Sequence, residues 1–161
     1  MFSFFNFDKR FSKPNHQYFL IQNKEIKRNT LLIWDLENIS MKFTNQIFKQ
    51  LPYTPEHAIV VTKQKLNFKK LKYLMWRLFT IEDTHKTISD DKIKELIRKY
   101  NPKELILISS DSDFSPTVNS MLKKNKKVYW VFLDKTKSRL LMKTDISNSN
   151  LKLISIKGKQ K

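Results

Sequence analysis

LLIWDLEN, residues 31–38, decides the fold of this chain together with LILISSDSDF, residues 105–114. In both stretches a run of bulky apolar residues is followed at once by polar and acidic residues. An unbroken apolar run of this length is typical of a strand that is buried on both faces. The pattern therefore predicts two central strands of a sheet, each carrying acidic side chains at its carboxyl end.

Strands and helices alternate along the rest of the chain. The predicted strands are residues 31–34, 57–63, 104–110, 127–133 and 151–156. The predicted helices are residues 40–51, 66–78, 89–101 and 112–125, with a short one at 138–142. Such alternation implies βαβ units. We therefore expect a three-layer α/β/α fold with a mostly parallel central sheet and helices on both faces.

Composition sets the first limits on function. The 161 residues fit one domain, and 32 Lys and Arg against 15 Asp and Glu give a net charge of +17. This charge favours nucleic acid or an anionic membrane as partner, although a lysine-rich composition explains much of the excess equally well. The absence of cysteine excludes disulfides, thiolate catalysis and Cys-type zinc sites. His16, His57 and His85 show no metal-ligand spacing.

Localisation follows from the apolar segments. No apolar run approaches the ~20 residues that span a bilayer, and Asp8 and Lys9 interrupt the aromatic N-terminus before a signal-peptide core can form. We therefore expect a soluble cytoplasmic protein that does not act at a membrane.

Acidic residues stand at the ends of both central strands. Asp35 follows the first strand, Asp111 and Asp113 follow the second, and Asp90 begins a helix between them. In parallel sheets ligands bind outside the carboxyl ends of the strands, where converging carboxylates repel one another until a divalent cation relieves them. A site of oxygen ligands without sulfur suits Mg²⁺ or Mn²⁺. Taken singly, each of these acids is equally typical of a turn or of a helix N-terminus.

The same segments resemble the NYN domain, a branch of the PIN-like ribonuclease superfamily. The resemblance rests on Asp35 with Asn38, on KTISDDKI at residues 86–93, on SSDSDF at residues 109–114 and on the closing segment 138–154. It covers residues 30–156 and implies a PIN-like, Rossmann-type domain. Ser110 stands where the family has a glycine.

The resemblance implies a metal-dependent ribonuclease, expected to be an endonuclease, with one or two Mg²⁺ or Mn²⁺ ions. It implies Asp35, Asp90, Asp111 and Asp113 as metal ligands and Asn38 as a residue that orients a ligand or phosphate. Asp91 is the alternate to Asp90, and Asp145 is a further acid of the closing segment. The hydroxyls expected to donate to phosphate or to the acids, or to form turns, are those of Ser109, Ser110 and Ser112.

RNA binding is expected from the basic and aromatic segment around residues 63–86. Mixed basic and aromatic residues suit a single strand, although an amphipathic helix with a solvated lysine face explains them as well. KKNKK at residues 123–127 is interpreted as a solvated helix end. The candidate RNA-binding residues are Lys63, Lys65, Lys69, Lys70, Lys72, Arg77 and Lys86.

Three functional interpretations remain open from the sequence. The first is the ribonuclease, and the second is a catalytically silent RNA-binding module with the same fold. The third is a Toprim-like or phosphatase-like domain, although Glu37 stands where a haloacid-type phosphatase needs a second Asp. Residues 1–29 are expected to be an extension that packs on the sheet or mediates a homodimer, residues 30–156 the nuclease domain, and residues 157–161 a basic tail.

Overall fold

The computed structural model describes residues 24–62, Lys69, residues 80–83 and residues 89–158. The strands in these residues are β1 (Ile26–Asp35), β2 (Thr54–Thr62), β3 (Thr80–Asp83), β4 (Glu104–Ile108), β5 (Lys127–Leu133) and β6 (Leu151–Ile156). The α-helices are α2 (Thr44–Gln50), α4 (Ser89–Tyr100), α5 (Ser115–Lys123) and α6 (Lys137–Lys143). Short 3-10 helices precede three of them: η3 (Met41–Phe43), η4 (Ser112–Phe114) and η5 (Asp134–Thr136). No helix within these residues has the length and apolar character needed to cross a membrane.

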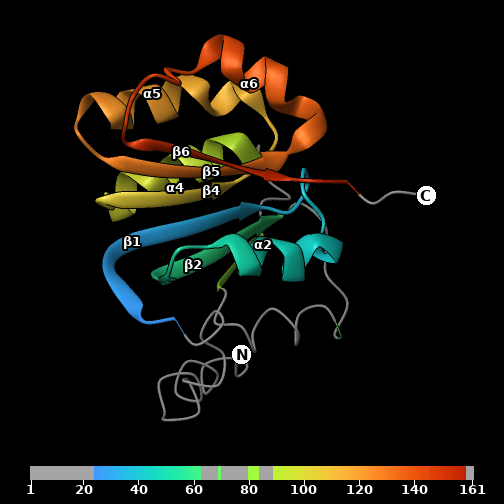
Figure 1. Ribbon diagram of the computed structural model, residues 1–161. Coiled ribbons are helices and arrows are strands. Elements are labelled where there is room, and N and C mark those ends of the chain that lie inside the picture. Colours follow the sequence, from blue (N-terminus) through green and yellow to red (C-terminus); the bar gives the residue numbers. More distant parts are fainter. Residues whose placement is uncertain (1–23, 63–68, 70–79, 84–88, 159–161) are drawn as a thin grey trace.

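The strands form one sheet in the order β3-β2-β1-β4-β5-β6, and every neighbouring pair is parallel. The chain moves outward from β1 to β3, returns to β4 beside β1, and then moves outward in the other direction to β6. Helices α4, α5 and α6 cover one face of the sheet, while η3 and α2 cover the other (Figure 1). The predicted α/β/α fold with a parallel sheet is confirmed.

The central strand β1 contributes to both halves of the core. Leu31 and Ile33 pack under α4 and α5, whereas Leu32 and Trp34 pack on the α2 side, and all four are fully buried. Alternate residues of a strand point to opposite faces of the sheet, so a strand covered on both sides needs an unbroken apolar run. By the same alternation, Asp35 points to the face that α4 and α5 cover.

Two strands differ from the sequence prediction. β1 begins at Ile26 rather than at Leu31, because its backbone continues to pair with β2 beyond the buried run, across a register shift. The sequence does not predict β3, which pairs with β2 at the sheet edge. The helix predicted at residues 66–78 lies outside the described residues, except for Lys69, which is helical and exposed.

Asparagine takes the left-handed backbone positions of the described residues. Asn29, Asn101 and Asn125 have φ angles of 62°, 43° and 63°. Asn101 follows α4 and Asn125 lies just beyond α5, where many helices end on a glycine in this conformation. The chain has a single glycine, and Asn tolerates the left-handed region better than most residues. Asparagine therefore ends both helices and turns the chain into the strand that follows.

Candidate metal centre

The topology brings the carboxyl ends of β1 and β4 side by side. These two strands are neighbours in the sheet, yet the chain leaves them in opposite directions, toward β2 and toward β5. Such a switch point opens a crevice beyond the strand ends, where ligands bind in open α/β sheets. Asp35 is the last residue of β1, and Asp111 lies three residues beyond the end of β4.

Asp35 is fully buried, with 0% of its surface exposed. Its Oδ2 accepts hydrogen bonds from Asn38 Nδ2 at 2.6 Å and from Ser109 Oγ at 3.0 Å. Its Oδ1 is the one buried side-chain polar atom of the described residues that has no hydrogen-bond partner. Burial raises the pKa of Asp35, the two hydrogen bonds lower it, and the charge of Asp111 raises it further, so the pKa lies above its ordinary value.

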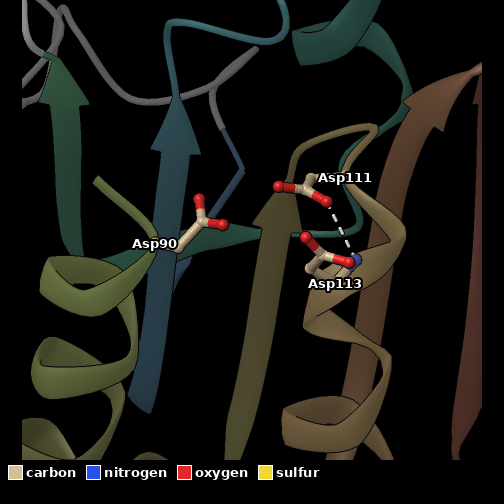
Figure 2. A group of neighbouring side chains, drawn as sticks. All are labelled: Asp90, Asp111 and Asp113. Atoms are coloured by element: carbon tan, nitrogen blue, oxygen red, sulfur yellow. Dashed lines mark hydrogen bonds between the residues drawn. The ribbon is translucent and has the colours of Figure 1, made fainter. Parts of the chain in front are cut away.

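Asp111 and Asp113 are held by the turn that follows β4. Asp111 is the N-cap of η4, and its Oδ1 accepts a hydrogen bond from the backbone N–H of Asp113 at 2.9 Å (Figure 2). The backbone N–H of Asp111 donates to Ser109 Oγ at 3.1 Å, and the same hydroxyl donates to Asp35. Ser109 thus links the acids that follow the two central strands.

Asp90 approaches these acids from the first turn of α4. Figure 2 shows its carboxylate turned toward Asp111 and Asp113 across the end of the sheet. Asp90, Asp111 and Asp113 each offer one oxygen, and these oxygens lie within 4.8 Å of one another. Burial, reinforced by the charges of Asp111 and the other neighbouring acids, raises the pKa of Asp90 to about 6. Asp91 is exposed and stands outside this group of three.

The donor set fits a hard divalent cation. It consists of carboxylate oxygens alone, which Mg²⁺ and Mn²⁺ prefer, and the charges of neighbouring acids raise the pKa of Asp90 and of Asp35. The unpartnered Oδ1 of Asp35 is a second and independent indication, because a buried oxygen without a donor is costly unless a ligand satisfies it. Asp90, Asp111 and Asp113 would hold such an ion, with Asp35 next to them.

The remaining predicted hydroxyls and acids have other surroundings. Ser110 Oγ accepts the backbone N–H of Leu133 at 2.8 Å, so this hydroxyl ties the turn to the end of β5. Ser112 is half-buried in η4. Asp145 is exposed beyond α6, where its carboxylate accepts a hydrogen bond from Ser147 at 2.8 Å, and it does not belong to the group of three.

Most of the basic segment predicted to bind RNA lies outside the described residues, Lys69 excepted. The structure instead places other lysines beside the acids. A hollow of about 1080 Å³ has Asp90 and Asp113 in its wall together with Lys94, Lys123, Lys124 and Lys143. From the sequence alone, Lys123 and Lys124 are expected only to be part of a solvated helix end. One signal could have indicated this surface: polar residues recur along α5 at positions 119, 120 and 123, the spacing of one helical face.

Comparisons with known proteins place the chain in a family. The family model of the NYN domain matches residues 29–148, which include all four aspartates of the site. No curated protein matches the chain. A crystal structure of a protein of unknown function from Vibrio parahaemolyticus is similar in fold, with a TM-score of 0.60 at 16% identity over 83% of this chain and 93% of that chain. Because the family model covers well over half of the sequence, this chain belongs to the NYN domain family.

Proposed function

We propose that this chain is a metal-dependent ribonuclease that cuts RNA internally by hydrolysing phosphodiester bonds. The observation that carries the proposal is the convergence of Asp90, Asp111 and Asp113 beside the buried, half-satisfied carboxylate of Asp35. Membership of a family with a PIN-like nuclease fold supports it. The net charge of +17 supports a polyanionic substrate.

Each polar residue of the site has a distinct task in this proposal. Asp90, Asp111 and Asp113 would hold one Mg²⁺ or Mn²⁺ ion, and Asp35 would offer its free Oδ1 to the same ion or to a second one. A bound ion supplies Lewis-acid chemistry: it polarises the scissile phosphate and lowers the pKa of a coordinated water. Asn38 and Ser109 hold Asp35 in one orientation through its Oδ2, which leaves the other oxygen available.

The phosphatase-like interpretation receives less support. It requires a second acid two residues after the first one, at the position of Glu37. The carboxylate of Glu37 accepts a hydrogen bond from Thr62 at the end of β2 at 3.3 Å, and it is not part of the acidic group. Glu37 is therefore poorly placed to act as the general acid of a phosphatase.

The test is cleavage of labelled single-stranded RNA and DNA in Mg²⁺, in Mn²⁺ and in EDTA. Asp111→Asn is the informative variant, because asparagine caps a helix as well as aspartate does and keeps an oxygen for the N–H of Asp113. Its matched control is Asp134→Asn, an exposed aspartate outside the acidic group whose hydrogen bond from Ser155 asparagine can also accept.

The proposal expects RNA cleavage that needs metal, disappears in Asp111→Asn and persists in Asp134→Asn. Equal cleavage by both variants would show that the activity comes from a contaminating nuclease or from another site. RNA that is bound but not cut in any metal would replace the proposal with a catalytically silent RNA-binding module.

A further inference from the structure

The hollow beside the acids forms an open channel whose walls include α4 and α5. Its wall on the α4 side contains Asp90, Asp91 and Lys94, and its other walls come from η4, α5 and the end of α6. Asp90 and Asp113 belong both to this hollow and to the acidic group. A polymer bound at the acids therefore has this channel directly in front of it.

Four lysines line the channel together with its aspartates. Lys94, Lys123, Lys124 and Lys143 line it, and within the described part of the chain none of them forms an ion pair with an acid. Lys126, which follows closely, has its pKa lowered by burial and by the charge of Lys124. Positive charge is thus concentrated at the end of α5 without internal neutralisation.

Hydrogen bonds between α5 and the segment after α6 keep this wall in place. Asn119 Nδ2 donates to the backbone oxygen of Lys143 at 3.1 Å, and Asn119 Oδ1 accepts the backbone N–H of Asp145 at 2.9 Å. One helical turn earlier, the buried hydroxyls of Ser115 and Thr144 lie 2.9 Å apart. These contacts fix the backbone around Lys143 relative to α5, which carries Lys123.

We propose that this channel, called here the lysine channel and lined by Lys94, Lys123, Lys124 and Lys143, binds the RNA backbone phosphates on one side of the cleaved bond. The inference rests on the proposed ribonuclease function and adds where the substrate strand runs. The described lining contains aspartate, lysine, serine, asparagine and one proline, but no aromatic residue. Base stacking is therefore absent from these contacts, and the channel binds phosphates without regard to base sequence.

The length of α5 sets the reach of the channel. Its nine residues span about 13 Å at about 1.5 Å per residue, from the turn that carries Asp113 to Lys123. A stacked strand advances about 3.4 Å per nucleotide, so the lysines contact phosphates up to about four nucleotides from the bond that is cut.

The first experiment measures binding of labelled single-stranded RNA against salt concentration in EDTA, where no metal-dependent cleavage interferes. The channel variant replaces Lys94, Lys123, Lys124 and Lys143 with Gln. The control variant replaces four exposed lysines elsewhere with Gln and changes the net charge equally: Lys49, Lys99, Lys103 and Lys152. The measured quantity is the slope of log affinity against log salt concentration. With about 0.7 counterions released per phosphate contact on a single strand, this slope should become shallower by up to about 3 in the channel variant. The control variant should keep the parental slope. Equal losses in both variants overturn the proposal.

The second experiment shortens the RNA on one side of the mapped cleavage position and then on the other. Below about four nucleotides on the side that occupies the channel, the affinity difference between parent and channel variant disappears, while shortening the other side preserves it. A difference that survives both truncations overturns the assignment. The salt experiment needs no cleavage, so a channel that binds RNA in a protein that never cuts it would contradict the proposed function alone.

Discussion

At the scale of single residues, the carboxyl group of Asp35 is fully buried, and one of its two oxygens has no hydrogen-bond partner. A folded protein keeps such a group when something outside the chain completes its coordination. Asn38 and Ser109 both donate hydrogen bonds to the other oxygen, Oδ2, and so fix the orientation of the carboxyl group. The carboxylate is therefore oriented by the protein and left half free.

Asp35→Asn is expected to abolish cleavage and to preserve the fold. The amide oxygen still accepts from Asn38 and Ser109, while the negative charge and the free carboxylate oxygen are lost. Replacing residues that merely support metal ligands costs about 10–100-fold, so we expect a loss of at least about a hundredfold here. Cleavage rates, thermal unfolding in EDTA and RNA affinity are measured together. Full activity in a folded Asp35→Asn protein would contradict the assignment of this residue to the metal centre.

Asp90 gives the site a dependence on pH in the absence of metal. Its pKa is raised to about 6 by burial and by neighbouring acids. A raised carboxyl pKa means that the folded state holds its proton more tightly than the unfolded state does. The resulting stabilisation is complete below the unfolded pKa of about 4 and is lost as the pH rises through about 6.

Asp90→Asn is therefore expected to stabilise the metal-free protein at pH 7.5 and to leave it unchanged near pH 4. The raised pKa of Asp90 corresponds to at most about 3 kcal/mol in the free energy of unfolding. Because Asp90 is partly exposed to solvent, we expect a stabilisation of about 1 kcal/mol, or about 2–4 °C in Tm. Thermal unfolding in EDTA across this pH range measures the effect. Saturating Mg²⁺ should reverse the order, since the ion stabilises only the protein that keeps this ligand. A lower Tm for Asp90→Asn than for the parent protein in EDTA at pH 7.5 would contradict a destabilising repulsion between Asp90 and the neighbouring acids.

The acids of the site could be predicted from the sequence because each one follows or begins a recognisable element. Asp35 and Asp111 follow apolar runs, and Asp90 follows a serine at the start of a helical pattern. The lysine channel could not be predicted in this way. Lys94 and Lys143 are far from Lys123 in sequence, and the packing of α4 and α6 beside α5 brings them to one hollow.

At the scale of elements, the sequence predicts the strands that are continuous apolar runs and the helices that have one apolar face. β4 and β5 lie close to their predicted ranges because both are apolar and buried. The first part of β1 is exposed, and the sequence of β3 is TIED, so neither presents an apolar run. Backbone pairing with β2 defines both of these segments, and backbone pairing is not visible in a side-chain pattern.

Two buried tryptophans hold the loops that carry the acids. Trp34 Nε1 donates to the backbone oxygen of Ile39 at 2.7 Å, beyond Asp35. Trp130 Nε1 donates to the backbone oxygen of Ser109 at 2.8 Å, two residues before Asp111. Each central strand is thus followed by a turn that an indole N–H anchors, which helps to place the carboxylates.

Trp130→Phe is expected to lower both stability and metal affinity. The variant leaves the buried carbonyl of Ser109 without its indole donor, at a cost of about 1–3 kcal/mol, and it loosens the turn that carries Asp111. Phe132→Leu is the control, because Phe132 belongs to the same strand and the same buried cluster but provides no polar side-chain contact. Thermal unfolding and Mn²⁺ titration are measured for both. Equal metal affinities at reduced stability would show that the indole only fills space.

At the scale of the whole molecule, the sheet gathers the acids at one end and a second set of contacts at the other. Near the amino ends of the strands, Lys27 Nζ lies 2.7 Å from Glu104 and Tyr53 donates to the same carboxylate at 2.8 Å. Burial opposes ionisation of Glu104, yet its bonds to Lys27 and Tyr53 outweigh this effect and lower its pKa. This network ties the first part of β1 to β2 and β4, far from the proposed chemistry.

Removal of residues from the N-terminus tests where the domain begins. The sequence predicts a boundary at residue 30, whereas the carbonyl oxygens of Lys24 and Glu25 both accept hydrogen bonds from Thr54, and Asn29 O accepts the N–H of Lys103 at 2.8 Å. We predict that residues 24–29 belong to the folded domain. At about 1 kcal/mol for each of these lost hydrogen bonds and about 2–4 °C per kcal/mol, a chain of residues 30–158 should unfold about 6–12 °C below one of residues 24–158.

The full-length chain is the reference for this comparison, measured by thermal unfolding in the same buffer. The described contacts that complete β1 include those of Lys24, so we expect residues 24–158 to unfold at a higher temperature than residues 30–158. If residues 24–158 unfold as early as residues 30–158, the first 23 residues are part of the folded domain. If residues 30–158 match the full chain, the first part of β1 adds no stability and the boundary predicted from the sequence is correct. The acids lie at the other end of the sheet, and the truncations remove no residue of the lysine channel, so cleavage below the lower Tm should be the same in all three proteins.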